Sequence, residues 1–253
     1  MAGIDLAAKL NRREKVFTTM ISHTTWTGII PVLKKRNLDF VLFEMEHSHY
    51  DWRDLEGLLR MCKMLDLPSV VRVTDIAYHQ ISLFLDMGAT GVLIPRIERF
   101  EQLEQVINMV RLPPVGQKGV GGYDFSVGDL TAKLANYNKE KLILIQIERE
   151  KAIPELDKML ATGEVAGVIV GPFDLSVSLG IPGEFDHPQF LEAVQNVIRI
   201  CDERKVSCGM FLGEEANIRH WRGQGMNLIW SGSDMSFFIN GYNQLCDTID
   251  SIK

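Results

Sequence analysis

Two carboxylates follow two consecutive apolar runs of the chain, and their spacing is the first sign of chemistry. The run LILIQIE (142–148) ends in Glu148, and GVIVG (167–171) continues through a proline into Asp174. If both runs are neighbouring parallel strands, these side chains lie side by side at the strand ends. Two half-buried carboxylates repel each other and resist desolvation unless a cation lies between them. Two oxygen ligands, with room for water and substrate, are typical of Mg²⁺ or Mn²⁺. The structural alternative is that each carboxylate caps a helix or pairs with a lysine.

Basic groups follow two other apolar runs. Arg72 comes directly after SVV, where an unpaired guanidinium is costly, so it needs a protein carboxylate or an anionic ligand. His47 follows Glu46 at a strand end and is well placed for acid–base chemistry. His49 would complete a zinc pair with His47, but no third soft ligand is evident, so a hydrogen-bonded histidine is the simpler interpretation.

These residue types together indicate a reaction class. A divalent metal polarises a carbonyl, an arginine stabilises a developing oxyanion, and a histidine moves a proton. That combination suits enolate chemistry on a small oxo acid.

Short β-branched apolar runs alternate with longer segments of helical period along the chain. The strand candidates are 16–21, 39–46, 69–73, 90–95, 142–148, 167–171, 206–211 and 227–232. Helices are predicted at 52–65, 79–88, 98–111, 152–163 and 188–205. Most strand runs are apolar throughout, as in parallel strands covered by helices. The pattern predicts an α/β fold, a (β/α)₈ TIM barrel in a single domain over 1–253, with an open doubly wound sheet as the alternative.

The polar residues gather at one end of this predicted barrel. Strand ends carry Glu44, Glu46, Arg96 and Asp234 in addition to the residues above, so the carboxylates are expected to share one mouth. The segment 112–138 is the irregular part, too long for a simple loop. Its glycine run GQKGVGG neither follows a strand nor opens a helix, which argues against a dinucleotide-binding loop.

Composition excludes several function classes. The 253 residues carry a net charge of −6 and no basic tract, which argues against nucleic-acid binding. No apolar run approaches the roughly 18 residues that a membrane span needs. The four cysteines form no CxxC pair and are expected to be reduced, so the protein is predicted to be cytoplasmic.

The motifs resemble those of the HpcH/HpaI aldolase family, the metal-dependent class II pyruvate aldolases of the 4-hydroxy-2-oxo acid and 2-dehydro-3-deoxyglucarate type. The matching stretches are FEMEHSHYDWRDL, VVRV, LDMGATGVLIPRIE, LPPVGQKGVGG, LILIQIE and GVIVGPFDLSVSLG. They run from residue 39 to 180, and the strand order continues beyond them.

The resemblance implies a role for each matched position. Glu148 and Asp174 would hold Mg²⁺, Mn²⁺ or Co²⁺, and Gln146 with the backbone near Phe173 would place pyruvate on it. Arg72 would stabilise the enolate, and His47 would take the proton of the 4-hydroxyl. Asp86 would lie near the site and reach it from a neighbouring subunit. Relatives are oligomers, hexamers or trimers of dimers, with an exchanged C-terminal helix, here predicted at 234–250.

Three positions depart from the family pattern. Glu44 stands where relatives have an aspartate paired with the histidine, and Lys118 replaces an arginine. The first strand ends without the tryptophan that many relatives have. These changes leave the metal and enolate residues in place and affect the aldehyde side of the pocket.

The predicted function is cleavage of a 4-hydroxy-2-oxo acid to pyruvate and an aldehyde. One alternative keeps the site but makes it a malyl- or citramalyl-CoA lyase or an oxaloacetate decarboxylase. The other is a ligand-binding barrel without turnover, which Glu44 and Lys118 keep open.

Overall fold

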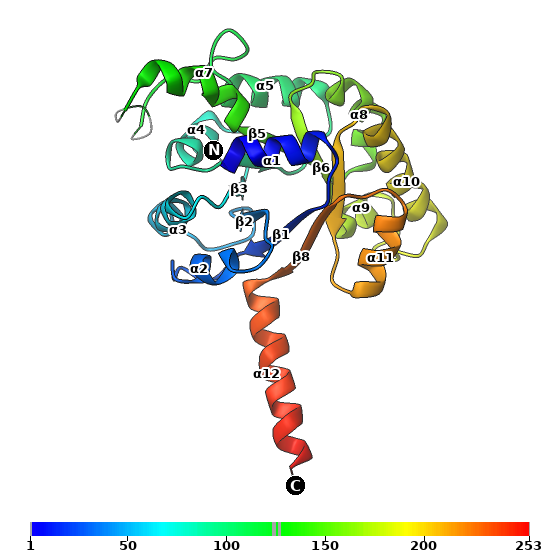
Figure 1. Ribbon diagram of the computed structural model, residues 1–253. Helices are drawn as coiled ribbons and strands as arrows, with labels where there is room; N and C mark the ends of the chain where they lie inside the picture. Colours follow the sequence, from blue (N-terminus) through cyan, green and yellow to red (C-terminus); the bar gives the residue numbers. More distant parts are fainter. Residues whose placement is uncertain (1, 123–124, 126–127, 253) are drawn as a thin grey trace.

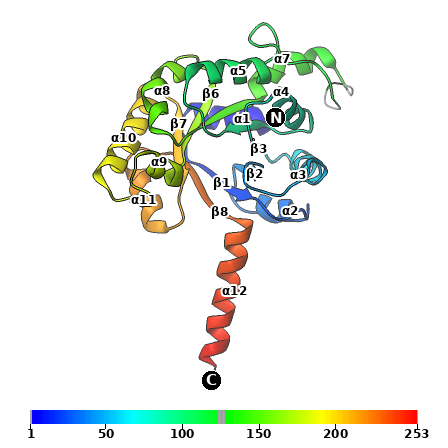
Figure 2. The ribbon, with the colours of Figure 1, turned by 180° about the vertical axis from the view of Figure 1, so that it is seen from behind.

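The protein is described by a computed structural model that covers residues 2–122, 125 and 128–252. Eight parallel strands pair in chain order, and β8 closes on β1. Figures 1 and 2 show the resulting barrel from opposite sides. The predicted TIM barrel is therefore confirmed, and the open sheet is wrong. The strands are Val16–Ile21 (β1), Phe40–Glu44 (β2), Ser69–Arg72 (β3), Gly91–Ile94 (β4), Leu142–Ile147 (β5), Val165–Val170 (β6), Ser207–Phe211 (β7) and Leu228–Ser233 (β8).

Both faces of these strands are buried, which explains why the sequence runs are apolar throughout. Phe43 and Val71 belong to the cluster that packs under the outer helices. Their neighbours Leu42 and Val70 belong to a second cluster that fills the barrel. Since successive strand residues point to opposite faces, strands such as β2 and β3 contribute to both clusters.

The outer helices include the five that the sequence predicts, with bounds close to the predicted ones, and four that it does not. They are Ile29–Lys34 (α2), Trp52–Met64 (α3), Tyr78–Asp86 (α4), Phe100–Val110 (α5), Leu130–Glu140 (α7), Ile153–Leu160 (α8), Pro172–Ser178 (α9), Pro188–Glu203 (α10) and Glu215–Gly223 (α11), with a short 3₁₀ turn at Glu150–Ala152 (η1). The prediction that 112–138 is irregular throughout is wrong, because α7 begins inside it. Asp129 caps α7 by accepting the N–H groups of Thr131 and Ala132.

The amino-terminal helix α1 (Ala2–Asn11) closes one end of the barrel. Leu6 and Leu10 are buried in the cluster that fills the barrel interior, and Ser207 of β7 donates a hydrogen bond to the Leu10 carbonyl. Because α1 leads directly into β1, this closed end is the amino-terminal end of the strands. The opposite end, where the strand carboxyl ends meet, is left for a site.

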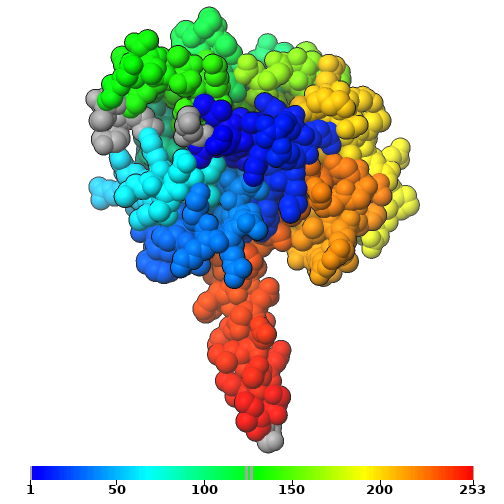
Figure 3. Space-filling model, viewed as in Figure 1, coloured from blue at the N-terminus to red at the C-terminus, as the bar shows by residue number. Residues whose placement is uncertain are grey.

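The carboxy-terminal helix α12 (Asp234–Ser251) extends away from the barrel, as both ribbon views and the space-filling view in Figure 3 show. None of its residues is buried, and it exposes a series of large apolar side chains: Met235, Phe237, Phe238, Ile239, Tyr242, Leu245 and Ile249. The predicted C-terminal helix is thus present, without a partner surface in its own chain. Within the described residues, no helix has the length and apolar character needed to cross a membrane.

The closing helix provides a test of the fold. Leu10 is fully buried, so Leu10→Ala leaves a cavity and should lower the free energy of unfolding by about 2–5 kcal/mol. Urea denaturation followed by circular dichroism measures the change. Asp5→Ala, at an exposed position of the same helix, is the control and should stay within about 0.5 kcal/mol. A Leu10→Ala loss no larger than the control would show that α1 does not contribute to the core.

Candidate active site

Five of the predicted site residues line one cavity at the carboxyl ends of the strands. Its volume is about 220 Å³, and its walls include His47, Arg72, Gln146, Phe173 and Asp174. His47 follows β2, Arg72 ends β3, Gln146 lies in β5, and the other two lie in the first turn of α9 after β6. The barrel therefore brings together residues that are far apart in the sequence.

The guanidinium of Arg72 is the buried centre of this site. Its side chain is 10% exposed and forms a close ion pair with Glu44. Its Nη1 lies 3.4 Å from the Gln146 amide oxygen, and its Nε lies 3.5 Å from a carboxylate oxygen of Glu46. The indole of Trp230 in β8 lies against it, 5.6 Å from ring centroid to Cζ. The sequence left open which anion neutralises Arg72, and the structure assigns that place to Glu44.

The Glu44 carboxylate accepts hydrogen bonds from backbone N–H groups and not from the imidazole of His47. One of its carboxylate oxygens accepts the N–H groups of Glu46 at 2.6 Å and His47 at 3.0 Å. The acid nearest the imidazole is Glu46, whose Oε2 lies 3.8 Å from His47 Nε2. The His47 side chain is 68% exposed, so it projects into the open mouth. The aspartate–histidine pair of the family pattern is therefore absent here.

Glu148 lies behind the cavity wall formed by Gln146 and Gly171. Its side chain is 2% exposed, and its carboxylate accepts the backbone N–H of Arg96 at 2.6 Å and the amide of Gln146. Burial raises the pKa of Glu148 to about 7. The charges of Glu46 and Asp174 contribute to this rise, while the Arg96 N–H and the charge of Arg72 oppose it. Among the described residues, the hydrogen-bond partners of this carboxylate are neutral groups.

The donor set near Glu148 fits a divalent cation with an incomplete protein shell. Among the residues that the structure describes, no three His, Cys, Asp or Glu side chains form a cluster able to hold a metal. This argues against the zinc site considered for His47 and His49. Glu148 and Asp174 instead offer two hard oxygen ligands, which leaves the remaining positions to water and substrate.

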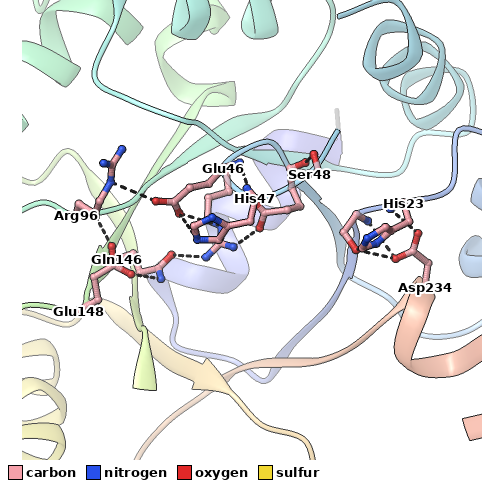
Figure 4. Close-up of polar contacts among 11 residues, drawn as sticks. His23, Glu46, His47, Ser48, Arg96, Gln146, Glu148 and Asp234 are labelled. Atoms are coloured by element: carbon pink, nitrogen blue, oxygen red, sulfur yellow. Dashed lines mark hydrogen bonds and ion pairs between the residues drawn. The ribbon is translucent and has the colours of Figure 1, made fainter. Parts of the chain in front are cut away.

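Three residues that hold this site together, Arg96, Glu46 and Trp230, had no individual role in the prediction from sequence. Arg96 has a left-handed backbone with φ of 52°, and its side chain reaches Glu46 at 3.2 Å and the Thr74 carbonyl. Figure 4 shows Glu46, Arg96, Gln146 and Glu148 as one connected group. Trp230, the third of these residues, packs against the guanidinium of Arg72. The place of all three at strand ends was a usable signal, but their contacts depend on local backbone conformation.

Asp234 forms a separate group, as Figure 4 also shows. Its carboxylate accepts the N–H groups of Ser22, His23 and Thr24 and joins the β1 end to the start of α12. Burial alone raises the pKa of Asp234, but these hydrogen bonds outweigh it and hold the pKa below its ordinary value. Asp234 thus lies at the carboxyl end of β8, as predicted, but its hydrogen bonds go to the segment after β1 and it does not line the small cavity.

Asp86 also lies apart from the site. It ends α4, at the far end of that helix from β3, and its carboxylate bonds to the fully buried Nζ of Lys118 at 2.7 Å. No described contact joins Asp86 to the cavity. Lys118 thus has a structural partner of its own.

The fold and the site together are those of a TIM barrel with a buried arginine and two carboxylates near the carboxyl ends of its strands. The model of the HpcH/HpaI aldolase/citrate lyase family matches residues 26–241, and the chain belongs to this family. The predicted family is thereby confirmed, and so is the predicted enzyme class, a carbon–carbon lyase of the aldolase type.

Individual relatives agree with this assignment. The chain is 31% identical over 219 residues to the 5-keto-4-deoxy-D-glucarate aldolase of Shigella dysenteriae, covering 86% of each chain. It is 28% identical over 215 residues to the hydroxypyruvate/pyruvate aldolase of Roseobacter denitrificans, covering 83% of each. The crystal structure of the HpcH/HpaI aldolase from Desulfitobacterium hafniense superposes with a TM-score of 0.89 at 29% identity, over 96% of this chain and 95% of that one. The fold also includes a Mycobacterium tuberculosis citrate lyase subunit solved with oxaloacetate and magnesium, at 11% identity and a TM-score of 0.56.

Gly171 allows a test of the carboxylate arrangement. A Cβ there would lie 2.7 Å from the Gln146 amide nitrogen and 2.9 Å from Glu148 Cβ, so Gly171→Ala must displace both side chains. We expect Mn²⁺ affinity, measured by isothermal titration calorimetry, to fall about tenfold or more, the usual range for a disturbed outer shell. Gly213→Ala is the matched control, because a Cβ there meets nothing within 4 Å. Equal affinities in the two variants would contradict the arrangement.

Proposed function

We propose that this protein is a class II aldolase that cleaves a 4-hydroxy-2-oxo acid reversibly to pyruvate and an aldehyde. One observation carries the proposal. The buried, Glu44-neutralised Arg72 faces the same small cavity as Gln146 and Asp174, beside the buried carboxylate of Glu148. The aldolase names of the relatives support it.

Glu148 and Asp174 would hold the divalent ion, Mg²⁺, Mn²⁺ or Co²⁺, which when bound supplies a Lewis acid for the 2-oxo group. Gln146 is within reach of Arg72 and orients the oxo acid beside it. Arg72 donates to the oxyanion of the pyruvate enolate as the C3–C4 bond breaks. The backbone near Phe173 closes the pyruvate side of the cavity.

His47 is the base in this scheme. It removes the 4-hydroxyl proton, so that the electron pair of that O–H bond forms the aldehyde carbonyl. Its exposed imidazole lines the cavity, and Glu46 Oε2 lies 3.8 Å from its Nε2.

We also propose a cytoplasmic homo-oligomer, a hexamer or trimer of dimers, built on a single barrel domain over residues 1–253. The support is α12, whose apolar side chains have no cover in their own chain. Exchange of α12 between subunits would bury them.

Metal removal is the first test. We expect pyruvate release from 4-hydroxy-2-oxopentanoate, coupled to lactate dehydrogenase, to vanish in EDTA and to return with Mg²⁺, Mn²⁺ or Co²⁺. Glu148→Ala should show neither turnover nor Mn²⁺ binding, because a lone Asp174 cannot hold the ion. Activity that persists after exhaustive chelation would overturn the metal assignment.

His47→Ala separates the aldolase from the decarboxylase alternative. Cleavage of the 4-hydroxy acid should slow by about 10²–10⁴-fold, the usual contribution of a general base. Decarboxylation of oxaloacetate has no 4-hydroxyl to deprotonate and should change by less than about threefold. Both rates are measured on one metal-loaded preparation. Equal losses would remove His47 from the role of base, and a wild-type enzyme active only on oxaloacetate would favour the decarboxylase.

A further inference from the structure

A second, larger cavity adjoins the candidate active site. Its volume is about 610 Å³, and it lies between the start of α9, the end of β7 and α11. Pro172, Phe173 and Phe211 line both this space and the smaller cavity with Arg72 and His47. We call the larger one the side cavity. A molecule bound in the smaller cavity can extend into the side cavity across these shared walls.

The side cavity has an aromatic wall. The Phe173 ring meets Phe185 edge to face, with centroids 5.1 Å apart, and Phe185 in turn lies 5.5 Å from Phe190. Trp221 of α11, almost completely buried, forms another part of the wall. Phe173 itself is 62% exposed, an unusual state for a large apolar side chain next to a polar site. A volume of this size with such a lining is typical of a small-molecule pocket.

The charged groups of the side cavity have one sign. Asp186 and Glu214 line it, and no lysine or arginine does so among the described residues. The other polar lining groups are Asn217 and His220. A ligand that carried a carboxylate into this space would meet two negative charges and no counter-charge, whereas an uncharged apolar chain would bury its surface against the rings.

The geometry points to the side cavity as the binding site for an uncharged, apolar tail on the aldehyde half of the substrate. This inference rests on the proposed aldolase function and names its substrate class. Pyruvate loses a proton from C3 to form its enolate, and enolate C3 bonds to the aldehyde carbon in the smaller cavity as the C=O π bond opens. The aldehyde oxygen takes up one proton, which balances the one lost from C3, and becomes the 4-hydroxyl. The tail crosses Phe173 into the side cavity. The relative named for 5-keto-4-deoxy-D-glucarate acts on a diacid, so this chain would differ from it on the aldehyde side.

The chain-length dependence of the aldol addition is the direct test. With Mg²⁺ and pyruvate present, kcat/KM should rise from glycolaldehyde to butanal to hexanal, by up to about fourfold for each buried methylene. Succinic semialdehyde matches butanal in carbon number but ends in a carboxylate, and it should react more slowly than butanal. A flat series, or a preference for succinic semialdehyde, would overturn the inference. Absence of reaction with every aldehyde would count against the proposed function instead.

A filling variant tests the cavity itself. Ala216 is an exposed α11 residue that lines the side cavity, so Ala216→Trp fills it without disturbing the core. We expect kcat/KM for hexanal to fall tenfold or more and that for glycolaldehyde to stay within twofold. Ala135→Trp, at an exposed alanine of α7, is the matched control and should change neither. Equal loss on both aldehydes, together with a smaller assembly in light scattering, would show that the side cavity is a subunit contact.

A binding measurement separates the side cavity from turnover. Saturation-transfer NMR with 1-hexanol, which has the tail but cannot react, should give a signal with the wild type and with Ala135→Trp. The signal should be lost with Ala216→Trp. An unchanged signal in Ala216→Trp, or none in the wild type, would overturn the proposed tail site whatever the catalytic results.

Discussion

The burial of one guanidinium determines much of the geometry at the mouth of this barrel. Arg72 and Glu44 are register partners of β3 and β2, so the pairing of two neighbouring strands delivers the acid that the buried cation requires. Leaving either charge unpaired at this depth would cost several kcal/mol. One carboxylate oxygen of Glu44 is thus paired with Arg72. The other accepts the backbone N–H of His47 and so fixes the position of that residue. His47, the proposed base, is therefore positioned through its main chain, and its imidazole projects into the open mouth.

The remaining charges of the site do not balance. Glu46 is matched by Arg96, whose side chain is half exposed and therefore screened by water. Glu148 receives only neutral donors, from the Arg96 backbone and the Gln146 amide. The interior of the mouth therefore favours a positive charge beside Glu148 and an oxyanion beside Arg72. A 2-oxo acid with a coordinated cation satisfies both requirements at once.

The barrel and most of the site were predictable because both depend on patterns that are local in the chain. Continuous apolar runs marked the strands, and polar residues at their ends marked the mouth. The contacts of Glu44 were not predictable, because the carboxylate could turn to an imidazole or to backbone N–H groups, and only the turn conformation decides. The contacts of Arg96 depend on its left-handed backbone conformation, which an arginine in the sequence does not predict. Helix α7 buries one side chain, Tyr137, and so shows no apolar stripe to detect.

Closure of the amino-terminal end of the barrel affects the order in which ligands bind and leave at the other end. With Leu6 and Leu10 of α1 packed into an interior already filled by strand side chains, a ligand reaches the site from the carboxyl ends of the strands. A ligand that binds against Gln146, next to the buried carboxylate, must then enter before one that binds near the exposed His47, and must leave after it. Compulsory-order kinetics would thus be built into the architecture, with the outer product departing first.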